Sequence, residues 1–304
     1  NKKAWYQTVV NIKCFYPATG LEKLCKLFGK SRQAFYDHSL RKNVKQISEA
    51  LIIDRVKQIR LLMPRIGCIK LHGMLKKELA EHNIMIGRDS FFELLGRYDL
   101  QIKRRKKYVR TTDSNHMFHK WADLTISLHT DAPEQLWVSD ITYLRTINGF
   151  IYLSLITDGY SRKIIGYHLS QHLKTQGCLI ALGKAIASLG SEDYQLIHHS
   201  DRGIQYCCNG YVDMLQRHKI KISMTQNGSP YENAIAERVN GILKSEQGLD
   251  QIFVSYHQAI GQTHLAINTY NNIRPHMSCG YLTPSQAHME SGKLKNVWKI
   301  KNKM

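Results

Sequence analysis

The chain has 304 residues, of which 43% are hydrophobic, so it can bury a sizeable core and form more than one domain. It carries 43 Lys and Arg against 24 Asp and Glu, a net charge of +19. No uninterrupted apolar run approaches the roughly 18 residues of a membrane span, and no two of the seven cysteines are spaced Cys-x-x-Cys. These features argue against a membrane protein and a disulfide framework, and they fit the reducing cytoplasm.

The positive charge is unevenly distributed along the chain. Residues 1–110 hold 25 basic and 9 acidic residues, a net charge of +16, whereas residues 111–304 have a net charge of +3. This asymmetry indicates a polyanionic partner, of which nucleic acid is the commonest. The alternative is a basic surface that only aids solubility.

The first predicted element pair is a helix-turn-helix. Residues 21–28 have apolar side chains at helical spacing, Gly29 breaks the pattern, and Ser31 is a good N-cap for a second helix. Arg32 and Gln33 would occupy the first turn of that helix, where such proteins contact DNA. An ordinary helical hairpin has the same pattern.

A second helical pair follows. Apolar residues from Ile69 to Leu79 predict one helix, Asn83 a turn, and residues 88–95 another helix. The basic run after this pair contains Arg104, Arg105 and Lys106, which are predicted DNA contacts. Two basic helical pairs in succession favour DNA binding over a plain helical bundle.

Five regions are predicted in chain order. They are a helix-turn-helix unit (1–60), a second such unit with a basic tail (61–110), a linker (111–134), a catalytic core (135–250) and a helical C-terminal tail (251–304).

The core is predicted to be an α/β domain. The expected strands are Leu136–Leu144, Phe150–Thr157, Lys163–Leu169, Gln195–Ser200 and Ile220–Met224. Asn148-Gly149 is predicted to turn the first hairpin, and helices are expected at 174–190, 211–217 and 231–246. This order predicts a mixed five-stranded sheet with helices on both faces, the ribonuclease-H type of layout.

Three acidic residues stand where this layout would place functional groups. Asp140 lies inside the first strand, where a carboxylate is costly unless it is paired, protonated or bound to metal. Asp201 ends the fourth strand, and Glu237 follows on the last helix with 35 residues between them. Two Mg²⁺ ions held by such carboxylates can clamp the attacking and leaving oxygens of a phosphodiester.

Asp158 is the rival for the first position. A symmetrical turn at Asn148-Gly149 would place Thr157 opposite Asp140, so that Asp158 points to the other face of the sheet. Asp158 is therefore expected to cap the turn at Asp158-Gly159, although a one-residue bulge would reverse this assignment.

Six motifs occur in order through the second half of the chain. They are Trp137-x-x-Asp140-Ile141-Thr142-Tyr143, His199-Ser200-Asp201-Arg202-Gly203-x-Gln205-Tyr206, Glu232-Asn233-Ala234-x-Ala236-Glu237, Lys244-x-Glu246, Tyr270-Asn271-x-x-Arg274-Pro275-His276 and Thr283-Pro284-x-Gln286. With the Asp-Asp-35-Glu spacing, these motifs resemble the DDE transposases and retroviral integrases, and specifically the insertion-sequence transposases of the IS-three family. The resemblance covers nearly the whole chain.

The resemblance implies an enzyme that binds the terminal inverted repeats of its element, cleaves there and joins the 3′-OH ends to target DNA. It implies that Asp140, Asp201 and Glu237 hold two Mg²⁺ ions, with Mn²⁺ able to substitute. It also implies a homo-oligomer on double-stranded DNA, associated with the nucleoid of a bacterium. Arg202 and Arg274, basic residues within two of the motifs, are further predicted DNA contacts.

Helix geometry extends these predictions to the helix of Glu237. Asn233, Glu237, Asn240 and Lys244 share one face at i, i+4, i+7 and i+11, so the other three are predicted to line the DNA path. Glu246 is interpreted as an ordinary surface residue.

The chain departs from the family at several positions. Glu232 and Arg238 stand where relatives often have Asp and Ser, and the amino-terminal region lacks the His-His-Cys-Cys zinc signature of retroviral integrases. His199 is interpreted as a wall of the site rather than a ligand. The alternatives are a catalytically idle DNA-binding regulator derived from such an element, and a structure-specific nuclease on the same fold.

Overall fold

A computed structural model describes residues 4–102, 119–190, 195–226 and 233–294. The chain forms two compact units, residues 1–58 with 75–101 (unit 1) and residues 59–74 with 102–304 (unit 2). None of the described helices is both long and apolar enough to span a membrane.

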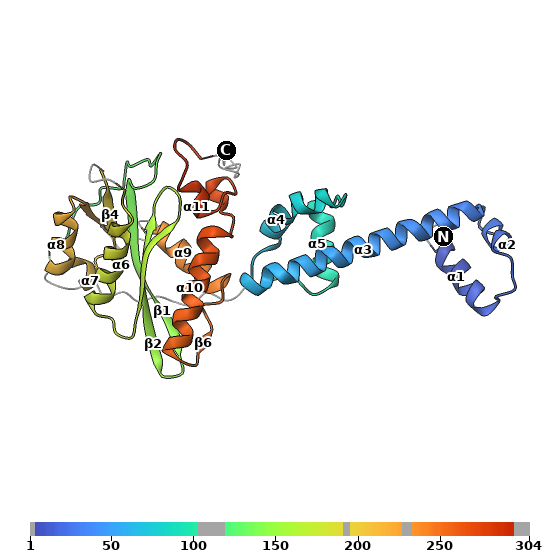
Figure 1. The fold of residues 1–304 in the computed structure, drawn as a ribbon, viewed down its shortest axis with the longest axis horizontal. Coiled ribbons are helices and arrows are strands. Elements are labelled where there is room, and N and C mark those ends of the chain that lie inside the picture. Colours follow the sequence, from blue (N-terminus) through green and yellow to red (C-terminus); the bar gives the residue numbers. More distant parts are fainter. Residues whose placement is uncertain (1–3, 103–118, 191–194, 227–232, 295–304) are drawn as a thin grey trace. The chain divides into compact units, whose positions relative to one another are not determined.

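Unit 1 begins with the predicted helical pair. Helix α1 (Trp5–Phe15) and α2 (Leu21–Lys26) precede the 31-residue α3 (Arg32–Leu62), and Gly29 turns the chain between α2 and α3 with a φ of +62° (Figure 1). The Ser31 hydroxyl accepts a hydrogen bond from the backbone of Ala34 at 3.0 Å, which confirms the predicted N-cap. A small aromatic core joins the three helices around Trp5, Val9, Leu24, Cys25 and Phe35.

The second helical pair also forms as predicted. Helix α4 (Cys68–Glu81) is followed by Asn83, which adopts a φ of +57°, and by α5 (Arg88–Arg97). Phe91, Leu94 and Leu95 of α5 are buried. The amino-terminal region is therefore all-helical, and the chain passes between the two units within α3 and within α4.

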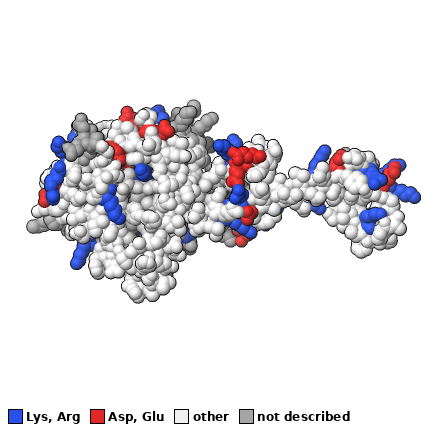
Figure 2. All heavy atoms as spheres, viewed as in Figure 1, with Lys and Arg blue, Asp and Glu red and all other residues white. Residues whose placement is uncertain are grey.

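The surface of unit 1 carries charges of both signs (Figure 2). Of the net +16 on residues 1–110, residues 103–110 supply +6 and residues 59–74 supply +3. Arg97 and Arg55 of unit 1 are paired with Glu49 and Glu78. Much of the positive charge therefore lies outside the helices of unit 1.

Unit 2 is built on a mixed sheet in the order β3-β2-β1-β4-β5, with a sixth short strand, β6, beside β1 (Figure 1). Its strands are β1 (Leu136–Thr146), β2 (Gly149–Asp158), β3 (Ile164–Ser170), β4 (Ile197–Ser200), β5 (Lys221–Met224) and β6 (Ile252–Phe253). Strand β2 is antiparallel to both β1 and β3, whereas β4 and β6 run parallel to β1, and β5 runs parallel to β4. The ribonuclease-H-like layout is confirmed, and β6 adds a strand that the prediction lacked.

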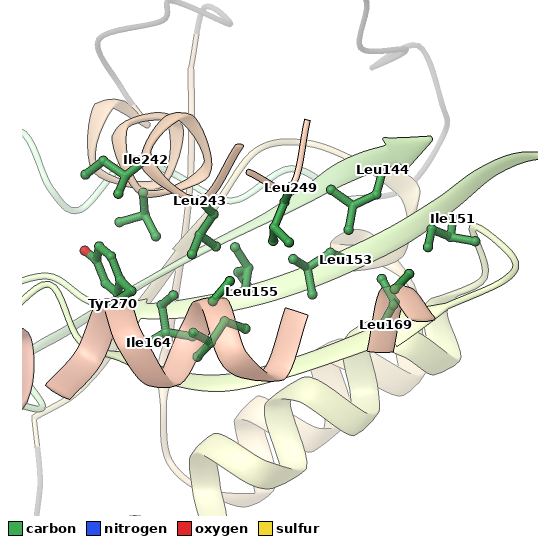
Figure 3. Packing of buried hydrophobic residues seen from close by; sticks show 14 of the residues in the cluster. Leu144, Ile151, Leu153, Leu155, Ile164, Leu169, Ile242, Leu243, Leu249 and Tyr270 are labelled. Carbon is green, nitrogen blue, oxygen red and sulfur yellow. The ribbon is translucent and has the colours of Figure 1, made fainter. Parts of the chain in front are cut away.

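Helices cover both faces of this sheet. They are α6 (Thr175–Ala187), α7 (Ile204–Cys207), α8 (Asn209–Arg217), α9 (Ala234–Ser245), α10 (Tyr256–Asn272) and α11 (Pro284–Ala287), with a 3-10 turn at Met277–Cys279. One core joins Leu144, Leu153 and Leu155 of the sheet to Leu243 of α9 and Tyr270 of α10 (Figure 3). A second core on the opposite face holds Trp137 and Ile156 with residues of α6 and α8.

The first hairpin turns one residue earlier than predicted. Thr146 pairs with Gly149, so the turn residues are Ile147 and Asn148, and the register is displaced by two positions. Gly149 has a φ of +122°, a conformation that favours glycine, and therefore starts the return strand instead of occupying the turn. A displacement of two preserves the alternation of faces. Asp158 pairs with Trp137, so its side chain lies on the face opposite Asp140.

Asp158 anchors the end of β2 and the C-terminal region. Its Oδ1 accepts hydrogen bonds from the backbone and hydroxyl of Ser161, both at 2.7 Å, and its Oδ2 accepts one from the backbone of Glu134 at 2.9 Å. The predicted turn cap is confirmed. The His288 ring donates from Nδ1 to the Ser161 hydroxyl (3.0 Å) and from Nε2 to Glu134 Oε1 (3.1 Å).

This arrangement requires a charged imidazole. Burial alone would lower the pKa of His288, but hydrogen bonds and charge from Asp158 and Glu134 outweigh it and raise the pKa from 6.5 to about 9. The cluster therefore joins α11 to the start of β1 and the end of β2 through an imidazolium between two carboxylates.

The His288 cluster predicts a dependence of stability on pH. A histidine whose pKa rises on folding stabilises the folded state fully below pH 6.5. This stabilisation is lost as the pH rises through about 9. The contribution should be about 3 kcal/mol at most. Denaturant unfolding of the full chain between pH 6 and 10 should show this loss, and His288→Gln should flatten it. His264→Gln, an exposed histidine on α10, is the control, and an equal slope in the His288 variant would contradict the assignment.

Candidate active site

The edge of β1 is open at the centre of unit 2. Strand β4 pairs with β1 from Leu136 to Val138, and β6 pairs with it only from Arg145 to Thr146. In the described part of the chain, no strand pairs with this edge between those two stretches. Asp140 lies in this stretch without a strand partner on that side.

Asp140 is buried, with 5% of its surface exposed. Its Oδ2 accepts a hydrogen bond of 2.6 Å from the side-chain amide of Asn240 on α9. This distance is short for a hydrogen bond between an amide donor and a carboxyl acceptor, so the bond holds the side chain firmly. The structure thus holds a carboxylate inside the strand, as the sequence predicted.

Asp201 follows β4, which runs parallel to β1. Val138 pairs with His199, and Asp201 comes directly after Ser200, the last residue of β4. The backbone N–H of Gly203 donates to Asp201 Oδ1 at 3.0 Å, and a Cβ on Gly203 would meet the same oxygen at 3.0 Å, which explains a glycine here.

Glu237 reaches this site from α9. Asn233, four residues before it, donates from its side-chain amide to the Ser139 carbonyl at 3.3 Å, and Asn240, three residues after it, binds Asp140. Residues at these spacings share one helix face, so Glu237 faces the same stretch of β1. Glu237 is half-buried.

The electrostatics place Asp140 and Asp201 in one environment. Burial, and after it Tyr152, raise the pKa of Tyr143, and the charges of Asp201 and Asp140 add to the rise. The buried Tyr206 hydroxyl responds in the same way, since burial dominates the rise in its pKa and both carboxylates contribute to it.

The donor set fits hard divalent cations. The three acids supply only oxygen atoms, which Mg²⁺ prefers. Two more buried oxygens, Asn233 Oδ1 and Asn240 Oδ1, have no hydrogen-bond partner among the described residues. A polar, partly unsatisfied surrounding of this kind suits a hydrated ion better than a packed apolar core does.

Glu134, Asp158 and His288 form a second group whose ligand atoms lie within 4.8 Å of one another. Both oxygens of each acid already accept hydrogen bonds, including one from Trp137 Nε1 to Glu134 Oε2, and His288 is protonated. Metal ligation would have to break these bonds and deprotonate the ring. The group is therefore assigned as a structural ion cluster.

Glu246 is mostly buried, with 14% of its side chain exposed, rather than an ordinary surface residue, which corrects the prediction. It accepts hydrogen bonds from Lys70 Nζ (2.8 Å), Arg274 Nε (2.8 Å) and Arg274 Nη2 (3.1 Å). Burial alone would raise the pKa of Glu246, but Arg274 and Lys70 outweigh it and lower the pKa to about 2. Of the two cations, Arg274 lowers the pKa of Glu246 more than Lys70 does, so Arg274 is the dominant partner of the carboxylate.

Arg274 was predicted to contact DNA, and the structure contradicts this. Its side chain is 1% exposed and is occupied by Glu246. Neighbouring motif residues are structural too, since the Tyr270 hydroxyl donates to the Arg162 carbonyl (2.9 Å) and the Asn271 amide bonds to both backbone groups of Ile164. This motif therefore secures α10 to β3 and α9.

The other predicted DNA contacts fall into three groups. Asn233 and Asn240 are buried against β1, so their predicted place along an open DNA path is wrong. Lys244 and Arg202 are half-buried near the site, and Arg32 and Gln33 are exposed on the first turn of α3. Arg104, Arg105 and Lys106 lie outside the described residues.

His199 does not face solvent. Its Nδ1 lies 2.8 Å from the Ser223 hydroxyl and 3.8 Å from Asp123 Oδ1, and the neighbouring His198 is held by Ser139 and Tyr211. Burial, with His199 adding to it, lowers the pKa of His198 to about 3, which keeps this ring neutral. The His pair thus ties β4 to β1, β5 and α8.

The Glu246 cluster predicts a large effect on stability. Glu246→Gln leaves two buried cations without a counter-charge and should lower the free energy of unfolding by about 3–5 kcal/mol. Lys70→Met retains the Arg274–Glu246 pair and should lower the free energy of unfolding by a clearly smaller amount. Denaturant unfolding measures both, and equal losses from the two variants would contradict the dominance of Arg274.

Comparison with known proteins agrees with this geometry. Two integrase core domain models match residues 130–230 and 218–284. The 31 kDa protein of insertion element IS600 from Shigella sonnei is 32% identical, over 86% of this chain and 96% of that protein. The transposase for IS629 from Shigella sonnei is 29% identical, over 72% and 74%. Transposase InsF for IS3A from Escherichia coli K12 is 36% identical, over 52% and 55%.

Solved structures show a weaker likeness. The HTLV-2 integrase catalytic core domain aligns with 53% of this chain and 99% of its own at 20% identity and a TM-score of 0.43. A chain of the simian T-cell lymphotropic virus intasome aligns over 78% and 81% at 17% identity and a TM-score of 0.46. Both the likeness to the insertion-element proteins and the motifs described above identify the family. This chain belongs to the IS-three family of insertion-sequence transposases with an integrase core domain.

Proposed function

We propose that this chain is a DNA transposase that binds the terminal inverted repeats of its element, cuts the DNA there and joins the 3′-OH ends to target DNA. One observation carries the proposal. Asp140 lies in β1, Asp201 directly follows the parallel strand β4, and Glu237 lies on α9 between two asparagines that hydrogen-bond to Ser139 and Asp140. Family membership supplies the reaction class, a polynucleotidyl transfer.

The proposed cofactor is Mg²⁺, as two ions held by Asp140, Asp201 and Glu237, and Mn²⁺ is expected to substitute. When bound, such ions lower the pKa of an attacking hydroxyl and stabilise the leaving oxyanion. The chain's own contribution is to place three acids on rigid elements. Asn240 holds Asp140 and Gly203 holds Asp201, so neither carboxylate has to reorganise when DNA arrives.

DNA engagement is proposed to be divided between the two units. Arg32 and Gln33 stand on the exposed first turn of α3, where a recognition helix meets base edges. Lys244, seven residues beyond Glu237 on α9, and Arg202, next to Asp201, are proposed to contact DNA beside the cut. Because the proposed reaction acts on two element ends and one target DNA, we expect a homo-oligomer on bacterial DNA.

A catalytically idle DNA-binding regulator is the alternative function. Loss of catalysis would remove the need for acids inside β1, whereas here a buried strand acid is retained and held by a dedicated amide. This observation favours the active enzyme.

The carboxylates provide the direct test. Asp140→Asn, Asp201→Asn and Glu237→Gln keep the size of each side chain and remove its charge, so strand transfer should fall by at least about a thousandfold while binding to element-end DNA is retained. Strand transfer is measured with labelled element ends and Mg²⁺. Asp158→Asn is the control, which should affect stability more than transfer. Near-normal transfer by the Asp140 variant would reject the proposal.

Recognition by unit 1 is tested in the full chain. The paired change Arg32→Ala and Gln33→Ala should reduce the preference for the terminal repeat over random duplex by at least tenfold, because base contacts specify sequence. Lys45→Ala, an exposed lysine farther along α3, should weaken binding to both DNAs alike. Binding is measured by anisotropy at several salt concentrations. An unchanged preference in the paired variant would place recognition elsewhere.

A further inference from the structure

Two asparagines flank Glu237 on the inner face of α9. Asn233 stands one turn before the acid and Asn240 one turn after it. Both side chains are more than nine-tenths buried, at 6% and 7% exposure. They therefore belong to the interior of the site rather than to the DNA-facing surface.

Each asparagine makes one contact with β1 through its amide nitrogen. Asn233 Nδ2 donates to the Ser139 carbonyl at 3.3 Å, and Asn240 Nδ2 donates to Asp140 Oδ2 at 2.6 Å. The two acceptors belong to consecutive residues of the strand. Together the amides fix the register of α9 against β1, and so the position of Glu237 relative to Asp140.

The oxygen of each side-chain amide accepts no hydrogen bond from the described residues. Asn233 Oδ1 and Asn240 Oδ1 are buried and have no hydrogen-bond partner among the described residues. An unsatisfied buried polar group costs about 1–3 kcal/mol. Two such groups beside the carboxylates make a purely structural role a poor explanation, because an apolar side chain would pack there at lower cost.

We infer that Asn240 is a positioning residue for Asp140, and that Asn233 supports it by fixing the strand backbone. The inference rests on the proposed function. An amide suits this task because it donates to one carboxylate oxygen without neutralising the acid. The bond to Oδ2 restricts the orientation of the Asp140 carboxyl group. A lysine here would compete with the cation, and a leucine would leave Oδ2 without this donor.

The test is Mn²⁺ binding to the full chain, measured by calorimetry without DNA. Asn240→Leu is expected to weaken Mn²⁺ binding at the Asp140 site by about tenfold or more, as loss of outer-shell partners does elsewhere. Asn240→Ala, which adds no bulk, tests the same loss if leucine does not fit. The Asp140→Asn chain identifies the binding signal that belongs to this site.

The matched control is Asn271→Leu, whose amide is fully occupied by the backbone of Ile164. It should lower the melting temperature and leave Mn²⁺ affinity unchanged. Wild-type Mn²⁺ affinity in both Asn240 variants, at whatever melting temperature, would overturn the positioning role. Absence of Mn²⁺ binding by the wild-type chain would overturn the proposed function as well, which separates the two failures.

Discussion

The candidate site of unit 2 depends on accommodating a buried carboxyl group inside a β-strand. Asp140 sits where most of the strand is apolar, and removing a carboxylate from water is costly unless its lone pairs find donors. The fold meets this requirement from two sides. The edge of β1 is left open beside the acid, and α9 is packed so that Asn240 reaches Oδ2. The position of Glu237 follows from the same packing.

Two other buried acids in unit 2 show a different solution. Asp158 lies against a protonated His288, and Glu246 accepts from Lys70 and Arg274. Both acids join segments that are far apart in the sequence, and both are held by cations. At Asp140 the donor from α9 is a neutral amide, which holds the group without cancelling its charge. The contact that α9 makes with Asp140 is therefore of a different kind from the contacts of Asp158 and Glu246.

The local sequence pattern was sufficient to predict much of the secondary structure and its turns. The strands, the Ser31 cap and the Asp158 turn all follow from alternation, turn residues and strand order. The register of the first hairpin was not predicted correctly. Asn148-Gly149 is compatible with a turn at either of two positions, and the φ of Gly149 decides between them.

The pairing of distant side chains also escaped prediction. Lys70 and Glu246 are separated by 176 residues, and Ser161 and His288 by 127. No local pattern specifies such partners, so Glu246 and Arg274 were misplaced on the surface. Helical periodicity correctly grouped Asn233, Glu237 and Asn240 on one face of α9. The asparagines were nevertheless assigned to DNA, because periodicity shows which residues share a face and not what that face contacts.

The central claim is that the catalytic cation site lies between Asp140, Asp201 and Glu237 and not at the Glu134–Asp158–His288 cluster. Anomalous diffraction from crystals of the full chain grown with Mn²⁺ tests this most directly. The account predicts anomalous density within ligand distance, about 2.2 Å, of carboxylate oxygens of Asp140 and Asp201, with Glu237 beside it. Density at His288, with none at Asp140, would contradict it.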